Sequence, residues 1–203
     1  EINLKKAIEI DSTYIEAHSN IAVMYVNWAR ELEKTKDDAA IDYFRKSINH
    51  LELLYKEYQD PAYLDNLLYA YFQTGNNKLA KELLNTIYSE LAGEEVKLKK
   101  DIDDVVKNDA VGDEKMTSDL KTLLELYQNW ENILSTEQKF VEPPYDEPIM
   151  EQKKNILRES LPYLILMHEI QPEKKSLMLQ IAKSYRAVGN EEKFKEWYAK
   201  YKN

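Results

Sequence analysis

Apolar residues recur every three or four positions along most of the chain, with charged and amide residues between them. This spacing places apolar side chains on one face of an α-helix. A clear example is the stretch with Leu120, Leu123, Leu124 and Tyr127. The pattern predicts a chain of amphipathic helices. Four glycines and six prolines in 203 residues disfavour a turn-rich all-β fold.

Two stretches repeat the same order of residue types, which indicates an internal repeat. Each has an aliphatic residue four positions before a tyrosine, a glycine four positions after it, and then an asparagine. The first copy is formed by Leu67, Tyr71, Gly75 and Asn76, and the second by Ile181, Tyr185, Gly189 and Asn190. Nine residues after the tyrosines stand Ala80 and Phe194, followed four residues later by Leu84 and Tyr198. The spacing predicts a helix, a glycine-marked turn and a second helix that begins after the asparagine.

This pattern resembles the tetratricopeptide repeat, a helix–turn–helix unit of ~34 residues. The resemblance implies an all-α fold, built as a right-handed superhelical array of antiparallel helix pairs. Stacked pairs bury apolar stripes that a single pair cannot bury alone. Residues 1–203 would then form one domain of this kind.

The repeat register divides the chain into segments of unequal regularity. Residues 1–14 fit the end of a preceding repeat, so the array is expected to continue upstream. Residues 15–60 form an irregular copy without the Gly-Asn turn, and 61–93 form a regular copy. Residues 94–116 fit no copy and are predicted to contain an extra helix, Glu95–Val106, and a loop, Asn108–Glu114, that together act as a flexible joint. Residues 117–174 form an irregular copy whose first helix is Asp119–Leu134 and whose loop, 135–148, is long, and 175–203 form the terminal copy.

The sequence contains no recognisable catalytic motif. The chain has no cysteine, and its histidines (His18, His50 and His168) are isolated on predicted helices. Glycine-rich phosphate loops are absent, and adjacent carboxylates such as Asp103-Asp104 fall in charged, exposed segments. We therefore predict a non-enzymatic protein with no catalytic residues, no cofactor and no metal site. An enzyme would need a pocket within 94–150 that holds a carboxylate of displaced pKa.

The charge balance narrows the classes of partner. A net charge of −9 disfavours nucleic acid, because phosphate contacts need a basic face. No apolar run approaches the ~20 residues of a spanning helix, so membrane insertion is not expected. The lack of cysteine is compatible with either redox environment, and the compartment stays open.

The resemblance implies that a protein or peptide partner binds the concave side, which the first helix of each pair lines. In this register the expected groove residues are Val23, Asn27, Asp65, Tyr69, Phe72, Gln73, Lys183 and Arg186, with Ser19, Val26, Lys121, Glu125 and Gln128 at neighbouring positions. Tyr69 and Phe72 have two open interpretations: exposed anchors for the partner, or packing against the neighbouring first helix. One branch of the family grips a terminal carboxylate, but only Asn66 matches that set, so this function is not carried over.

Two other roles remain open. The terminal helix carries Trp197, Tyr198 and Tyr201, which could pair two copies of the chain in a homo-oligomer and make the array an assembly module. The array could also be the non-catalytic repeat region of a larger protein. The Pro-rich acidic segment 141–148 is either a recognition peptide or a stiff loop between two helices.

Overall fold

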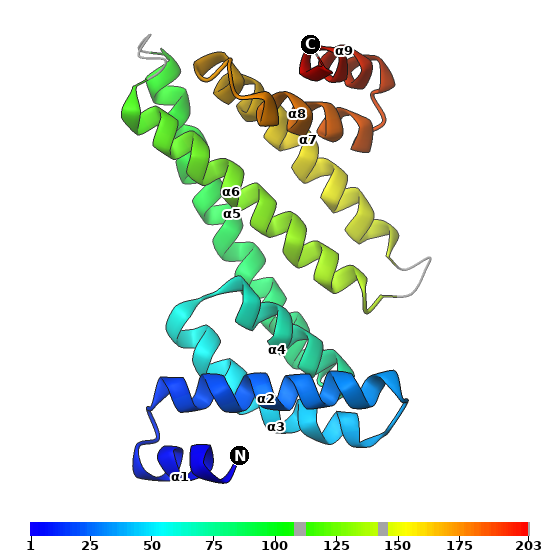
Figure 1. The fold of residues 1–203 in the computed structure, drawn as a ribbon. Coiled ribbons are helices and arrows are strands. Elements are labelled where there is room, and N and C mark those ends of the chain that lie inside the picture. Colours follow the sequence, from blue (N-terminus) through cyan, green and yellow to red (C-terminus); the bar gives the residue numbers. More distant parts are fainter. Residues whose placement is uncertain (108–112, 142–145, 203) are drawn as a thin grey trace. The chain divides into compact units, whose positions relative to one another are not determined.

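The computed structural model describes residues 1–107, 113–141 and 146–202, and every regular element in these ranges is a helix (Figure 1). The all-α prediction is therefore confirmed for the described part of the chain. The helices are α1 (Ile2–Ile10), α2 (Ile15–Lys34), α3 (Ala39–Tyr58), α4 (Pro61–Gln73), α5 (Asn77–Lys107), α6 (Glu114–Gln138), α7 (Glu147–Ile170), α8 (Lys175–Ala187) and α9 (Glu191–Lys202).

The chain forms two compact units, Glu1–Asn85 and Thr86–Asn203, where the sequence predicts a single domain. The boundary falls inside α5, which is one unbroken helix of 31 residues. The predicted helix Glu95–Val106 is the second half of this longer helix. Most of the predicted loop Asn108–Glu114, and residues 142–145 of the Pro-rich segment, lie outside the described residues.

The first unit is built on the hairpin of α2 and α3, with α4 packed on α3. Its core is apolar and aromatic, and its largest fully buried side chains are Tyr25, Phe44, Ile21, Leu51, Leu54 and Leu68. Helix α1 contacts α2 but contains no buried residue. Helix α1 ends at Ile10, inside the predicted segment 1–14, and its C-cap residue is Asp11.

The two predicted glycine turns have the same geometry, although they lie in different units. Gly75 and Gly189 have φ of 76° and 83°, a conformation that costs glycine little. In each turn the following asparagine N–H donates across the helix end, from Asn76 to Tyr71 O and from Asn190 to Tyr185 O, both at 2.8 Å. These six-residue hydrogen bonds are the mark of a Schellman helix ending.

The α2–α3 turn has the same ending without a glycine. Lys36 takes the left-handed position with φ of 57°, and the Asp37 N–H donates to Leu32 O at 3.1 Å. The turn that the sequence does not show in the copy 15–60 is therefore present in the backbone. A lysine in this conformation is strained relative to glycine.

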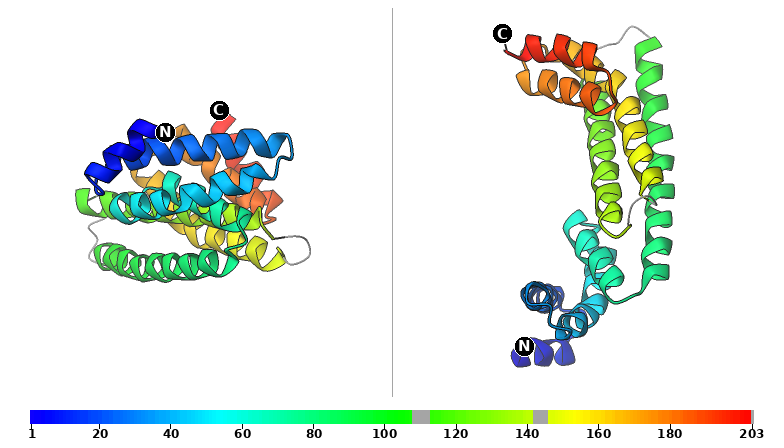
Figure 2. Two further views of the ribbon diagram at one scale, coloured as in Figure 1. Left: turned by 90° about the horizontal axis from the view of Figure 1, so that it is seen from below. Right: turned by 90° about the vertical axis from the view of Figure 1, so that its right-hand side faces the viewer.

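The second unit contains the antiparallel pair α6–α7 and the pair α8–α9, with α8 also packed on α7 (Figure 2). Helix α6 extends the predicted helix Asp119–Leu134 at both ends. Helix α7 ends at Ile170, two residues before Pro172. The predicted loop 135–148 is shorter than expected, because α6 continues to Gln138 and α7 begins at Glu147. Among the described helices, none combines the length and apolar character that crossing a bilayer requires.

Candidate functional site

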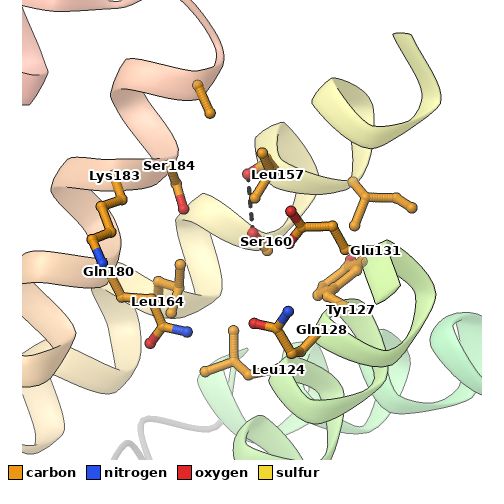
Figure 3. Close-up of a pocket in the computed structure, with 12 residues that line it drawn as sticks. Leu124, Tyr127, Gln128, Glu131, Leu157, Ser160, Leu164, Gln180, Lys183 and Ser184 are labelled. Atoms are coloured by element: carbon orange, nitrogen blue, oxygen red, sulfur yellow. Dashed lines mark hydrogen bonds between the residues drawn. The ribbon is translucent and has the colours of Figure 1, made fainter. Parts of the chain in front are cut away.

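A groove in the second unit is the first candidate site. It consists of two adjoining cavities of about 310 Å³ each, which share Leu124, Gln128 and Gln180. The first cavity lies between α6, α7 and α8 (Figure 3). The second extends along α6 toward the start of α8 and includes Lys121 and Lys174. We refer to the two cavities together as the α6–α8 groove.

The helix patterns of α6 and α8 explain why the α6–α8 groove has a mixed lining. On α6 the stripe Leu120, Leu123 and Tyr127 is buried, and the adjacent stripe with Leu124 and Gln128 stays accessible. On α8 Ile181 and Ser184 are buried, and Gln180 and Lys183 are exposed beside them. The amides of Gln128 and Gln180 point toward each other across the groove (Figure 3). The result is a leucine floor with amide groups above it.

Helix α7 supplies the remaining wall through Leu157, Ser160 and Leu164. The buried Ser160 hydroxyl donates to Leu157 O within the helix at 3.0 Å, so it is not a free donor. Small side chains at Ser160 and Ser184 keep the first cavity open.

The α6–α8 groove has a slight excess of positive charge in a chain of net charge −9. Its lining holds three lysines, Lys121, Lys174 and Lys183, against Glu125 and Glu131. Lys121 lies 3.7 Å from Glu125. Lys174 and Lys183 are exposed and form no ion pair with any carboxylate of the described residues. Local charge therefore favours a ligand that carries a carboxylate.

Four residues that the repeat register predicts lie in this groove. Lys183, Lys121, Glu125 and Gln128 all line it. Arg186 does not, and its guanidinium lies over the Phe194 ring, 5.2 Å from the centroid. Gln180 and the α7 wall are not predicted by the repeat register. Helical periodicity marks Gln180 as exposed, but only the packing of α8 on α7 brings it to the groove.

The other predicted groove residues belong to the first unit. Val23 is 50% exposed and Asn27 is exposed, whereas Asp65, Phe72 and Gln73 are half-buried. None of them lines a pocket described here.

Tyr69 packs within the first unit on α2 and α3. Its hydroxyl donates to both carboxylate oxygens of Glu33, at 2.8 and 2.9 Å. The Arg30 guanidinium lies 5.6 Å from its ring centroid, and the Phe44 ring lies 5.3 Å away. Burial, followed by the Glu33 hydrogen bond, raises the pKa of Tyr69. These contacts match the packing interpretation of Tyr69 rather than the exposed anchor.

The aromatic residues proposed for self-association divide into two groups. Trp197 is buried and meets the His168 ring edge-on, with centroids 5.3 Å apart. Tyr198 is 36% exposed, and its ring makes tilted contacts with Phe194 and Tyr201, at centroid distances of 5.4 and 6.0 Å. Any pairing of two copies through α9 would therefore use Tyr198 and Tyr201, and this role stays a prediction.

Two histidines that the sequence treats as isolated form a hydrogen-bonded pair in the first unit. His18 Nε2 lies 3.0 Å from Ser12 O, and because a carbonyl only accepts, this nitrogen donates. The Nδ1 atoms of His18 and His50 lie 2.8 Å apart, so one of them donates a hydrogen bond and the other accepts it. Burial, with His18 and Lys5 nearby, lowers the pKa of His50 to about 4. The pair is a structural contact between α2 and α3.

We expect the His50 site to make stability depend on pH. The unfolded chain binds this proton near pH 6.5 and the folded chain only near pH 4, so the free energy of unfolding should fall as the pH drops through that window. One such proton contributes at most ~1.4 kcal/mol per pH unit, and less here because the ring is half-exposed. Urea unfolding at pH 7, 6, 5 and 4.5 measures the effect. The variant His50→Gln should have a flatter profile, and parallel profiles for the two proteins would contradict the assignment.

A second pocket of about 300 Å³ lies between α5, α6 and α7, within the second unit. Its lining combines three aromatic residues, two carboxylates and two amides: Tyr88, Tyr127, Trp130, Glu95, Glu159, Gln152 and Asn155, together with Ile156. We call it the aromatic pocket. It shares only Tyr127 and Ile156 with the α6–α8 groove.

The Lys99 ammonium contacts two carboxylates that line the aromatic pocket. Lys99 Nζ lies 2.9 Å from Glu95 Oε1 and 2.7 Å from Glu159 Oε2, which ties α5 to α7. The Tyr127 hydroxyl donates to the same Glu95 oxygen at 2.7 Å. Burial alone lowers the pKa of Lys99, but the hydrogen bonds to Glu159 and Glu95 outweigh burial and raise it overall. Lys99 is therefore charged at every physiological pH.

The phenols of this pocket stay protonated. Burial first, and then donation to Glu137 at 2.7 Å, raises the pKa of Tyr88. Burial and the Glu95 contact raise the pKa of Tyr127 in the same way. Both rings therefore remain neutral aromatic surfaces.

No group of three or more histidine, aspartate and glutamate side chains in the described ranges is arranged to hold a metal ion. Comparison with known proteins adds no assignment: no family model and no curated protein matches the chain. Its chemistry therefore has to be inferred from the α6–α8 groove and the aromatic pocket themselves.

Proposed function

We propose that the protein is a non-enzymatic helical-repeat adaptor of the tetratricopeptide type, which binds an extended segment of a partner protein in the α6–α8 groove. The observation that carries the proposal is the continuity of the groove, in which two cavities share Leu124, Gln128 and Gln180. An elongated site over a leucine floor suits an extended chain better than a compact metabolite.

The side chains of the α6–α8 groove suit peptide recognition. Each glutamine amide offers both a donor and an acceptor, which is what a peptide backbone requires. Leu124 and Leu164 offer apolar contact for alternate side chains of the bound segment. Lys183 and Lys174 would orient an acidic residue of that segment by charge.

The experiment starts from the intact chain with a photo-crosslinking residue at Gln180, incubated with extract of the source cell. A partner should be captured from position 180 and not from position 195, where the natural Lys195 is exposed on α9 outside the groove. The crosslinked peptide then identifies the bound segment.

Affinity measurements on that segment test the chemistry. The variant Lys183→Glu should weaken binding about tenfold, because a like charge would then face the acidic residue of the ligand. The matched variant Lys195→Glu should bind like the wild type. Equal binding by all three proteins would overturn the groove assignment.

A further inference from the structure

We propose that the aromatic pocket is a second binding site, which takes an organic cation of the guanidinium or alkylammonium class. The proposal does not depend on the groove, since only Tyr127 and Ile156 line both sites. Three features of the pocket lead to this ligand class: its rings, its carboxylates and a lining whose described residues include no lysine or arginine. Lys99 lies beside the pocket, with its Nζ 5.9 Å from the Tyr127 ring centroid, so Tyr88 and Trp130 are the rings open to a ligand.

The rings provide the first feature. Tyr88 on α5 and Trp130 on α6 are stacked at 20° with centroids 6.2 Å apart, and both are half-buried. The Tyr88 hydroxyl is fixed by Glu137, so its ring has a set orientation. The face of an indole or phenol attracts a cation through the ring quadrupole, and tryptophan does so best.

The second feature is unbalanced negative charge. Glu95 and Glu159 both line the pocket, and among the described residues Lys99 is the single ammonium that contacts them. Lys99 uses Oε1 of Glu95 and Oε2 of Glu159, so each carboxylate keeps one oxygen that the described residues do not bind. Two carboxylates against one ammonium leave a net charge of −1 beside the rings.

The third feature is the composition of the lining, which contains no lysine or arginine. The α6–α8 groove, by contrast, contains three lysines. The two sites therefore select opposite charges. A volume of about 300 Å³ suits a guanidinium and its alkyl stem, and the chain charge of −9 raises the local concentration of cations.

The cation has two sources, an arginine side chain of a protein and a free amine, and matched probes distinguish them. The peptide probe is acetyl-Gly-Gly-Arg-Gly-Gly-amide, and the small probe is agmatine. The control peptide replaces arginine with citrulline, which has the same shape without the charge. If proteins supply the ligand, the arginine peptide should bind more tightly than agmatine, because the Gln152 amide and the Asn155 side-chain NH₂ can pair with its backbone. The Asn155 Oδ1 already accepts from Arg158 at 2.6 Å. Tighter binding of agmatine would assign a free amine.

Indole N–H signals in NMR spectra of the full chain report binding, because the chain has three tryptophans. Trp130 should shift saturably with each cationic probe, with a dissociation constant on the order of 1 mM for so small and open a site. Trp28 and Trp197, which do not line the pocket, serve as internal references. The variant Trp130→Phe assigns the signal.

Two variants on α7 complete the test. Glu159→Gln, at a side chain that is 59% exposed and tolerant of change, should weaken binding roughly three- to tenfold. Glu169→Gln, also exposed on α7 but outside the pocket, should leave it unchanged. The proposal is overturned if Trp130 does not shift, if the citrulline peptide shifts it equally, or if all three indoles move together.

Discussion

Replacing Ala80 with phenylalanine should lower the free energy of unfolding of the first unit by about 1–3 kcal/mol. Ala80 is fully buried in the first turn of α5. The corresponding position of the terminal copy holds Phe194, which is half-buried under Arg186 and Tyr198. The same position of the predicted repeat is thus fully buried at Ala80 and partly exposed at Phe194, so a ring fits only the second.

Urea unfolding of the intact chain measures this difference, with two matched controls. Leu79→Phe adds a ring at the neighbouring residue, which is 45% exposed, and should change stability by less than ~0.5 kcal/mol. Phe194→Ala should cost less than Ala80→Phe, since its ring is only partly buried. Equal stability of Ala80→Phe and wild type would mean that the α5 start has room for a ring.

The helix ends were predictable where they depend on local backbone chemistry. Gly75 and Gly189 mark their turns because a left-handed residue is required there and glycine adopts that conformation at little cost. Lys36 occupies the equivalent position in the α2–α3 turn, although lysine disfavours that conformation. No residue type in the sequence therefore indicates this turn. The packing of α2 against α3 holds this turn in place, because it buries Tyr25 of α2 and Phe44 of α3.

Helix α5 shows where local signals fail. The sequence places a boundary after Gly93, yet the helix continues to Lys107. A glycine inside a helix costs about 1 kcal/mol. The buried side chains of Leu91, Leu98 and Ile102 follow one another at helical spacing on both sides of it, and their burial exceeds that cost. Tertiary packing therefore overrides the local preference.

The residues of the candidate sites also fall into two groups: those that the sequence predicts and those that depend on contacts between helices. Gln128 and Lys183 follow from the repeat register, because each lies on the accessible face of one helix. The contacts between His18 and His50, and between Lys99 and Glu159, join residues 32 and 60 positions apart. Periodicity identifies which face of a helix each residue occupies, but not which helix meets that face. For this reason the aromatic pocket, which joins residues of α5, α6 and α7, could not be predicted from the sequence.

Replacing Lys99 with methionine should have two separable effects. Met keeps the apolar stem but removes the ammonium that Lys99 places between Glu95 and Glu159. We expect the free energy of unfolding to fall by about 1–3 kcal/mol, because Glu95, whose side chain is only 17% exposed, would lose its charged partner. Urea unfolding checks this result. Lys100→Met, at the exposed neighbouring residue, should stay within ~0.5 kcal/mol of the wild type.

The same variant should bind the arginine peptide more tightly than the wild type, by about fivefold or more, because both carboxylates then face the pocket without an internal cation. Binding should in turn restore part of the lost stability, since a ligand of the folded state stabilises it by mass action. The Trp130 indole signal measures the affinity. Lower stability with unchanged affinity would retain Lys99 as a structural ion pair but remove the organic cation from the aromatic pocket. Unchanged stability would instead show that the Lys99 contacts contribute little to the packing of α5 on α7.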